Sequence, residues 1–206
     1  MTVEAITNEW LRSARRRQRD IRYISYLIPL AAPTGLCAIV TARIVDGRQP
    51  IFRQVRRGKD GIPFVIYKVR SQSAPGVPTR IGHVFRFTSV DELPQFYNVT
   101  RGEMSLFGPR PLMPSDINEM SQALPSKIFR EWLIAYDHAG PGCLSSFAHF
   151  ARRHGRTVNR QKLLEMRAAL DTQDVKLSSP NYERLLLWRI GPTAIHMIMY
   201  PGDSLY

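Results

Sequence analysis

The most distinctive hydrophobic pattern in the chain is an uncharged run at residues 23–42. As a helix, this run would extend about 30 Å, close to the thickness of the hydrocarbon core of a bilayer. Pro29 and Pro33 interrupt it, and a proline inside a helix removes a backbone hydrogen bond and disfavours a straight span. The pattern therefore predicts two half-helices of about 15 Å each, forming a re-entrant helix-break-helix hairpin with its break at these prolines.

Charges on both sides of the run favour this hairpin over a single crossing. Residues 12–22 are strongly basic with Asp20 as their one acidic residue, and more arginines follow from Arg43 onward. Because basic flanks tend to stay in the cytoplasm, both ends of the run are expected on one side of the membrane. Two other interpretations stay open: a buried core helix, and a signal peptide cleaved after Val40-Thr41-Ala42.

After this run, the spacing of hydrophobic residues changes to one typical of strands. Residues 50–58 and 62–70 predict two short strands joined by a turn at Asp60-Gly61, and residues 72–80 have the composition of a loop. Helical spacing follows at residues 90–100, 115–136, 160–171 and 181–199. We therefore expect a mainly α fold with a small β-hairpin, in which the re-entrant segment precedes a compact domain that carries interfacial amphipathic helices.

Composition narrows the function classes. The chain has 206 residues, of which 44% are hydrophobic, enough for one domain with a core, so wholesale disorder is excluded. Its net charge of +12 favours an anionic partner, which could be nucleic acid, a phospholipid surface or a phosphorylated substrate. Cys37 and Cys143 are too far apart in sequence for a C-x-x-C pair, which argues against a disulfide scaffold or a cysteine zinc site. The histidines show no metal-ligand spacing, and no P-loop or G-x-G-x-x-G motif is present.

Candidate chemistry lies in the basic stretch between Arg43 and Arg110, where Asp91 and Glu92 are adjacent. Paired carboxylates among arginines suit reactions at a phosphate ester, because cations must neutralise both the carboxylate and the phosphoryl group. Mg²⁺ commonly binds one or two carboxylates together with substrate phosphate oxygens. A purely structural alternative is that Ser89 and Glu92 form a capping box at the start of a helix.

The order of motifs along the chain resembles the bacterial sugar transferases, which are monotopic polyprenyl-phosphate phosphoglycosyl transferases in their small catalytic form. The resemblance extends from about Arg15 to Met199 and is densest between Pro50 and Pro114. The matching pieces are Pro50-Ile-Phe-Arg-Gln54, Pro63-Phe-Val-Ile-Tyr-Lys68-Val-Arg70-Ser71, Thr79-Arg-Ile-Gly82, Arg86, Asp91-Glu-Leu-Pro-Gln95, Asn98-Val99, Gly102-Glu-Met-Ser105 and Gly108-Pro-Arg-Pro-Leu112. The family also begins with basic residues, an aspartate and a proline-broken re-entrant helix, and the matching residues here are Arg15, Arg16, Asp20 and Pro33.

The resemblance implies a ping-pong reaction at the carboxylate pair. Asp91 would attack the β-phosphate of a nucleoside diphosphate sugar, usually a UDP-sugar, and would also bind Mg²⁺. Glu92 would assist as the neighbouring acid or base. Further cations would bind phosphates or organise the pair; these are Lys68, Arg70, Arg86 and Arg110.

The resemblance also implies the partners and the location. The phosphosugar would pass to polyprenyl (undecaprenyl) phosphate, giving the first lipid-linked intermediate of a glycan. Residues 1–48 would form the basic segment and the membrane helix. Residues 49–206 would form the catalytic domain, on the cytoplasmic face of the bacterial inner membrane. No nucleic-acid partner is expected, and the oligomeric state stays open, with a homodimer as one option.

The chain departs from the family pattern in its C-terminal half. Gly140-Pro141-Gly142 stands where the family usually has Arg-Pro-Gly, and an arginine at 152, 153 or 156 could supply the missing charge. Because of this departure, a membrane-associated relative that lacks catalysis and acts as a scaffold is an alternative function. A basic nucleic-acid-binding protein is another, supported by charge alone.

Overall fold

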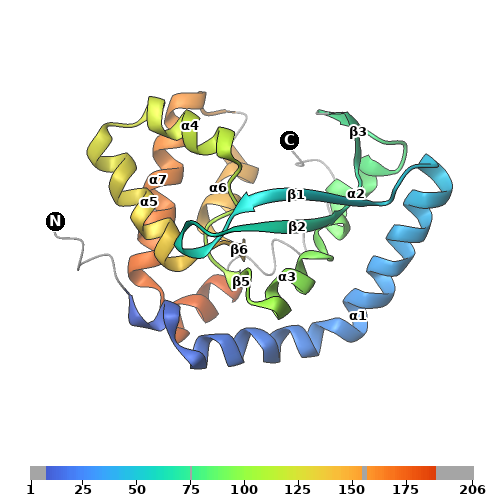
Figure 1. Cartoon of the computed structure of the whole chain (residues 1–206), viewed down its shortest axis with the longest axis horizontal. Coiled ribbons are helices and arrows are strands. Elements are labelled where there is room, and N and C mark those ends of the chain that lie inside the picture. Colours follow the sequence, from blue (N-terminus) through green and yellow to red (C-terminus); the bar gives the residue numbers. More distant parts are fainter. Residues whose placement is uncertain (1–7, 75, 155–156, 189–206) are drawn as a thin grey trace.

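The computed structural model describes residues 8–74, 76–154 and 157–188 (Figure 1). Helices predominate among these residues, and the strands form three two-stranded sheets. The prediction of a mainly α fold with a small β-hairpin is thereby confirmed. The division of the chain at residue 48 stays a prediction.

The uncharged run belongs to one long helix, α1 (Ala14–Asp46), preceded by the short 3₁₀ turn η2 (Glu9–Arg12). The Ser13 side chain caps the start of α1 by accepting a hydrogen bond from the Arg16 amide, and Gly47 ends the helix in a left-handed conformation. Figure 1 shows that α1 changes direction near the middle of its length. The helix-break-helix hairpin is therefore not confirmed: α1 bends, but its helical structure continues through Pro29 and Pro33.

The bend in α1 has a local cause. Pro29 and Pro33 have no backbone N–H, so each leaves a carbonyl one turn earlier without its helical donor. The Ser25 hydroxyl donates to the Ile21 carbonyl at 2.9 Å, and the Thr34 hydroxyl donates to the Leu30 carbonyl at 2.8 Å. Such bonds from serine or threonine to the preceding turn compete with the helical pattern and bend helices.

The predicted hairpin is present and is the longest sheet. Strands β1 (Ile51–Arg57) and β2 (Pro63–Val69) are antiparallel, with Ile51 opposite Val69. The turn η3 (Lys59–Gly61) joins them, and Asp60 and Gly61 both have positive φ there, as tight turns between twisted strands require.

The segment after the hairpin differs from its prediction. Residues 72–80 contain a second small hairpin, β3 (Gln72–Ala74) with β4 (Val77–Pro78). Helix α2 (Gly82–Thr88) follows. The predicted helix at 90–100 is divided into the turn η4 (Val90–Glu92) and helix α3 (Gln95–Arg101).

The C-terminal half is helical and also contains one parallel strand pair, β5 (Ser105–Phe107) with β6 (Gly142–Leu144). Pro125 divides the predicted helix at 115–136 into α4 (Pro114–Ala123) and α5 (Ser126–Ala139). Helices α6 (Ser146–His154) and α7 (Arg160–Leu177) come next, and a helix at 180–188 continues to the end of the described residues. In Figure 1 the β1–β2 hairpin crosses the middle of the molecule. Helices α4 to α7 lie on one side of it, and the part of α1 after its bend, called here the second arm of α1, lies on the other.

Two larger apolar clusters hold these parts together. In one, α1, β2 and α3 pack through Ile24, Ile66 and Val99. In the other, α4, α5 and α7 surround the fully buried side chains of Trp132 and Tyr136.

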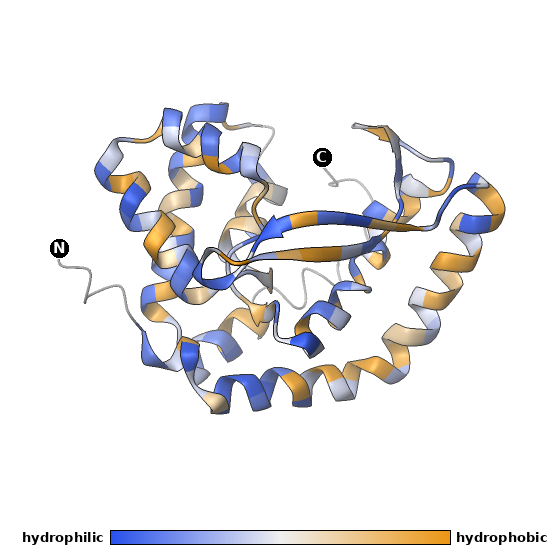
Figure 2. Cartoon of the chain, viewed as in Figure 1, coloured by the Kyte–Doolittle hydropathy of each residue, from blue (hydrophilic) through white to orange (hydrophobic). Residues whose placement is uncertain are grey.

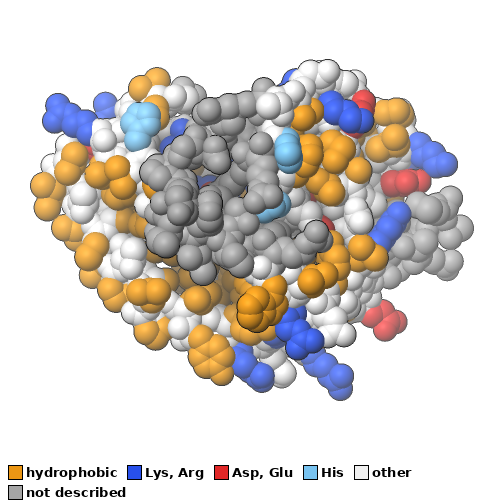
Figure 3. All heavy atoms as spheres, turned by 180° about the vertical axis from the view of Figure 1, so that it is seen from behind, with side chains coloured by type: hydrophobic (Ala, Val, Ile, Leu, Met, Phe, Trp, Pro, Cys, Tyr) orange, Lys and Arg blue, Asp and Glu red, His pale blue; other side chains and the backbone are white. Residues whose placement is uncertain are grey.

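Most of α1 does not belong to this core. Only 17% of its apolar window is buried, although the helix is long and apolar enough to cross a membrane by length and composition. Figure 2 shows apolar residues along the second arm of α1, and Figure 3 shows apolar side chains along the edge that this arm forms. The exposed apolar side chains include Tyr26, Leu27, Ile28, Leu30, Leu36, Val40 and Ile44. The alternative of a buried core helix is therefore wrong.

Candidate active site

Three of the predicted site residues come together at the end of the hairpin. Asp91 and Glu92 lie on the turn η4, and Lys68 lies on β2. The Lys68 ammonium forms an ion pair with Glu92 Oε1 at 2.8 Å. Ser71, just after β2, donates its hydroxyl hydrogen bond to Asp91 Oδ2 at 3.0 Å. Strand β2 thus provides a cation, and the segment just after it a hydrogen-bond donor, to the two adjacent carboxylates.

The Asp91 carboxyl group is largely removed from solvent, with 7% of the residue exposed. Burial and the neighbouring Glu92 charge raise its pKa to about 6, while Lys68 and the Ser71 hydrogen bond act in the opposite direction. At pH 7 a group with this pKa is about 90% ionised. Asp91 is therefore a carboxylate at neutral pH that is more basic than an exposed aspartate.

The turn that carries the carboxylates packs directly against α1. Val90 belongs to an apolar cluster with Ala38, Ala42 and Phe85. Gly35 of α1 is close enough to Leu93 that a Cβ at Gly35 would lie 3.7 Å from the Leu93 Cβ. The exposed apolar helix and the carboxylate pair are therefore adjacent in the structure.

The capping-box alternative is wrong for this turn. Ser89 has φ 56° and ψ 17°, in the left-handed region, and makes no side-chain cap hydrogen bond. A capping residue needs an extended backbone to direct its hydroxyl at the first helical amides.

Asn98 fixes the position of the strand that carries Lys68. Its side chain accepts a hydrogen bond from the Tyr67 amide at 3.2 Å and donates to the Val65 carbonyl and to Glu103, both at 2.7 Å. Asn98 is fully buried, so these bonds form away from water and tie α3 to β2.

The other predicted cations do not contact the carboxylates. Arg70 donates to the Gln49 carbonyl at 2.8 Å and stacks on Phe52. Arg86 lies half-buried in α2, and Arg110 is exposed. Among the described residues, no hydrogen bond or ion pair joins any of these three arginines to Asp91 or Glu92. Their phosphate-binding roles stay predictions.

Two residues near the pair were not singled out by sequence reasoning. Ser71 lies within a matching motif, but its bond to Asp91 spans 20 residues of sequence, and no spacing rule would have revealed it. Cys143 of β6 lies close enough to Glu92 and Lys68 for their charges to act on its thiol. Burial, and then the Glu92 charge, raises the pKa of Cys143 to about 12. The thiol is therefore protonated at neutral pH and is not a nucleophile there.

The donor atoms at the turn fit a hard cation of the Mg²⁺ type. In the described part of the chain, no three His, Cys, Asp or Glu side chains gather as a group that could bind a metal ion alone. Mg²⁺ commonly uses only one or two carboxylates and completes its coordination with water and phosphate oxygens. Asp91 and Glu92 provide such a carboxylate pair.

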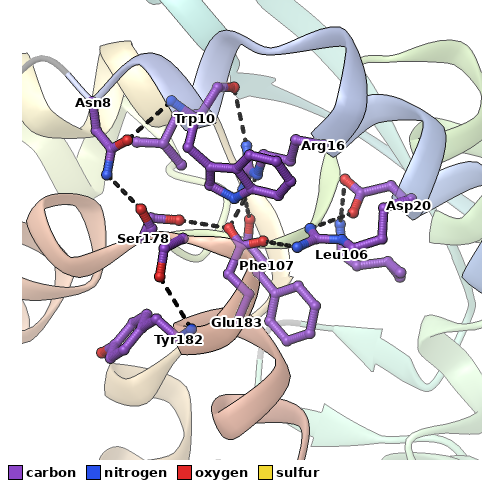
Figure 4. A network of polar contacts seen from close by, with 12 residues as sticks. Asn8, Trp10, Arg16, Asp20, Leu106, Phe107, Ser178, Tyr182 and Glu183 are labelled. Carbon is purple, nitrogen blue, oxygen red and sulfur yellow. Dashed lines mark hydrogen bonds and ion pairs between the residues drawn. The ribbon is translucent and has the colours of Figure 1, made fainter.

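The predicted membrane-flanking residues separate into two environments. Arg15 is exposed on the first turn of α1. Arg16 and Asp20 are buried, in the polar network of Figure 4: Arg16 pairs with Glu183 at 3.1 Å, and Asp20 pairs with Arg19 at 2.8 Å. This network joins the start of α1 to the helix at 180–188.

Comparison with known proteins gives a consistent result. The pattern of the family described as bacterial sugar transferase matches residues 11–190. The chain is 33% identical over 188 residues to a UDP-glucose:undecaprenyl-phosphate glucose-1-phosphate transferase of Caulobacter vibrioides, covering 85% of this chain and 65% of that protein. An Escherichia coli protein with the same description is 30% identical over 175 residues, covering 78% and 36%.

A shorter relative matches over most of its own length. A putative undecaprenyl-phosphate N-acetylgalactosaminyl 1-phosphate transferase of Bacillus subtilis is 40% identical over 144 residues, covering 62% of this chain and 80% of the relative. The chain thus spans about two thirds or less of the Caulobacter and Escherichia proteins. The sugars in these descriptions differ, so similarity alone does not identify one sugar.

Proposed function

The chain belongs to the bacterial sugar transferase family, and from that premise we propose that it transfers a phosphosugar from a UDP-sugar to polyprenyl phosphate. The product would be a polyprenyl diphosphate sugar, the first lipid-linked intermediate of a polysaccharide or glycoconjugate. The comparisons do not favour the scaffold or nucleic-acid alternatives.

One observation carries the proposal. The buried carboxylate of Asp91 and the neighbouring Glu92 lie on the turn η4, which packs against the apolar helix α1, and Lys68 of β2 lies beside them. A soluble nucleotide and a membrane-bound phosphate must both reach the reacting group. A nucleophile placed next to a helix at headgroup depth meets this requirement.

In the first half-reaction, an oxygen of the Asp91 carboxylate attacks the β-phosphorus of the UDP-sugar. A bond forms between that oxygen and phosphorus, and the bond from phosphorus to the bridging oxygen breaks, releasing UMP. The Lys68 ammonium lowers the repulsion between the two anions. The enzyme is left with the phosphosugar bound covalently to Asp91.

In the second half-reaction, a phosphate oxygen of polyprenyl phosphate attacks the same phosphorus, and the bond to Asp91 breaks. The carboxylate of Asp91 is regenerated, and the phosphosugar is now part of a diphosphate. Glu92, which pairs with Lys68 in the resting enzyme, would accept a proton from an acceptor phosphate that arrives protonated.

We assign a Mg²⁺ ion to Asp91, with water and substrate phosphate oxygens as its other ligands; when bound there, it would supply positive charge to the diphosphate. The arginines Arg70, Arg86 and Arg110 are proposed to bind phosphate groups once substrate is present. Re-entrant insertion of α1 would leave the remaining helices on the cytoplasmic face of the bacterial inner membrane, and the exposed apolar residues of α1 support this membrane association.

The test is UMP release by the purified full chain in detergent with undecaprenyl phosphate and Mg²⁺. UDP-glucose, UDP-galactose and UDP-N-acetylgalactosamine would be offered separately. We expect release with at least one donor and a loss of about a thousandfold or more in Asp91→Asn, because removing a nucleophile abolishes the covalent route. Glu165→Gln, on the exposed face of α7, is the matched control and should keep full activity. Equal rates in Asp91→Asn and the control would refute the proposal.

A further inference from the structure

A second basic site lies at the start of α1, apart from the carboxylate pair. A half-open cavity of about 110 Å³ is bounded by the first turn of α1, the hairpin turn η3, the segment after α3 and the segment after α5. Lys68, Asp91 and Glu92 do not line it. The cavity has room for several water molecules or for one small anion.

The lining of this cavity is strongly cationic. Arg12, Arg16, Arg17 and Lys59 contribute to it, against one carboxylate, that of Glu103. Glu103 is already engaged by other groups, because it accepts from Asn98 at 2.7 Å and pairs with Arg101 at 2.9 Å. The residues that line the cavity therefore provide little negative charge to neutralise its cations.

The four cations differ in how far their charge is compensated. Arg12 pairs with Asp60, and Arg16 pairs with the buried Glu183 (Figure 4). Among the described residues, Arg17 donates to the backbone carbonyls of Val99 and Thr100 in the last turn of α3 and pairs with no carboxylate.

Lys59 is the least compensated of the four. No hydrogen bond or ion pair joins its ammonium to another group in the described part of the chain. Burial and then the nearby Arg12 charge lower the pKa of Lys59; the Asp60 carboxylate opposes this shift, and Arg16 adds to it. Lys59 and Arg17 therefore line the cavity without an ion pair to a carboxylate among the described residues.

The backbone at Gly140 explains why Lys59 reaches this position. Gly140 has φ 70° and ψ 168°, a conformation that is almost exclusive to glycine. A Cβ there would approach the Lys59 Cβ to 2.9 Å. The arginine that the family usually has at this place would therefore collide with Lys59. Arg156 and the side chains at 152 and 153, considered earlier as replacements, lie outside the described residues.

We propose that this cavity binds a phosphate-type oxyanion through Lys59 and Arg17. Two cations lining a small, partly desolvated space favour a compact multiply charged anion over a single carboxylate. The anion has two possible sources: the phosphate of an anionic lipid headgroup, which the basic start of α1 would meet at the membrane surface, or free phosphate. The site does not depend on the catalytic proposal.

The experiment is calorimetric titration of inorganic phosphate into the full chain in detergent, in a phosphate-free buffer at constant ionic strength. A parallel arm measures binding to vesicles of phosphatidylcholine with and without phosphatidylglycerol. Lys59→Met removes the central ammonium, and Lys127→Met, on exposed surface of α5, removes an equal charge elsewhere. Lys59→Arg keeps the charge and shows that the position tolerates substitution.

We expect Lys59→Met to weaken anion binding about tenfold or more, with Lys127→Met unchanged and Lys59→Arg within about threefold of the parent. If Lys59→Met loses only the binding of inorganic phosphate, the ligand is free phosphate. If Lys59→Met loses only the additional vesicle binding that phosphatidylglycerol produces, the ligand is the phosphate of the lipid headgroup. The proposal is overturned if neither ligand binds the parent protein, or if Lys59→Met and Lys127→Met bind alike.

Discussion

Removing the Ser71 hydroxyl is a direct way to perturb the proposed nucleophile without touching it. The hydroxyl donates to Asp91 Oδ2 at 3.0 Å and stabilises the ionised carboxylate. Without it, the ionised form is less stable and the pKa of Asp91 rises further. A hydrogen bond to a charged group is worth roughly 1.5 kcal/mol at the lower end, and one pKa unit corresponds to about 1.4 kcal/mol. Ser71→Ala should therefore raise the pKa of Asp91 from about 6 to about 7.

The assay is the pH profile of kcat/KM for UMP release, whose acidic limb reports ionisation in the free enzyme. At pH 6 the ionised fraction would fall from about a half to about a tenth, so kcat/KM should drop about fivefold. At pH 7 the drop should be about twofold, and above pH 8.5 the two enzymes should be nearly equal.

Two variants control this prediction. Ser71→Thr keeps the hydroxyl and should keep the parent profile. Ser73→Ala removes a hydroxyl that bonds to the Val77 carbonyl, away from the carboxylates, and should not move the limb. An acidic limb that stays in place in Ser71→Ala would contradict the assignment of that limb to Asp91.

Other predictions follow from the same contacts. Lys68→Met should lower kcat/KM by about 10- to 100-fold and raise the pKa of Asp91, because the cation that opposes its protonation is gone; Lys162→Met is the control, and an unshifted pH profile would contradict this. Asn98→Ala should lower stability by about 2–4 kcal/mol, because three buried hydrogen bonds are lost; a thermal midpoint in detergent within 1 °C of the parent would count against it. Asp91→Asn should fold and be at least as stable as the parent at pH 7.5, because a carboxylate with a raised pKa destabilises the folded state above that pKa. A clearly lower midpoint at that pH would show that Asp91 has a structural role instead.

Local signals in the sequence were sufficient for some elements. The β1–β2 hairpin was predictable because Asp60-Gly61 fits a tight turn between two strand-like segments. The division between α4 and α5 was also open to prediction, since the residue before Pro125 is biased away from helix, and Leu124 is indeed extended. Helix α2 was not predicted, because its seven residues are too few to show a clear helical spacing of hydrophobic residues.

The candidate site was partly predictable for a different reason. Asp91 and Glu92 were named from their adjacency in a basic stretch and Lys68 through a resemblance, and the structure brings the three together. The bond from Ser71 and the approach of Cys143 depend on tertiary packing between distant segments, which no local pattern encodes. The path of α1 through its prolines likewise depends on hydroxyl-to-carbonyl bonds as well as on the prolines themselves.

The most direct measurement of the central claim is the intact mass of the protein after incubation with its UDP-sugar and Mg²⁺, without polyprenyl phosphate. The account predicts a mass increase of one phosphosugar, located on Asp91 by peptide mapping, lost on addition of polyprenyl phosphate and absent from Asp91→Asn. An adduct on another residue, or turnover to lipid product with no adduct at any time, would contradict it.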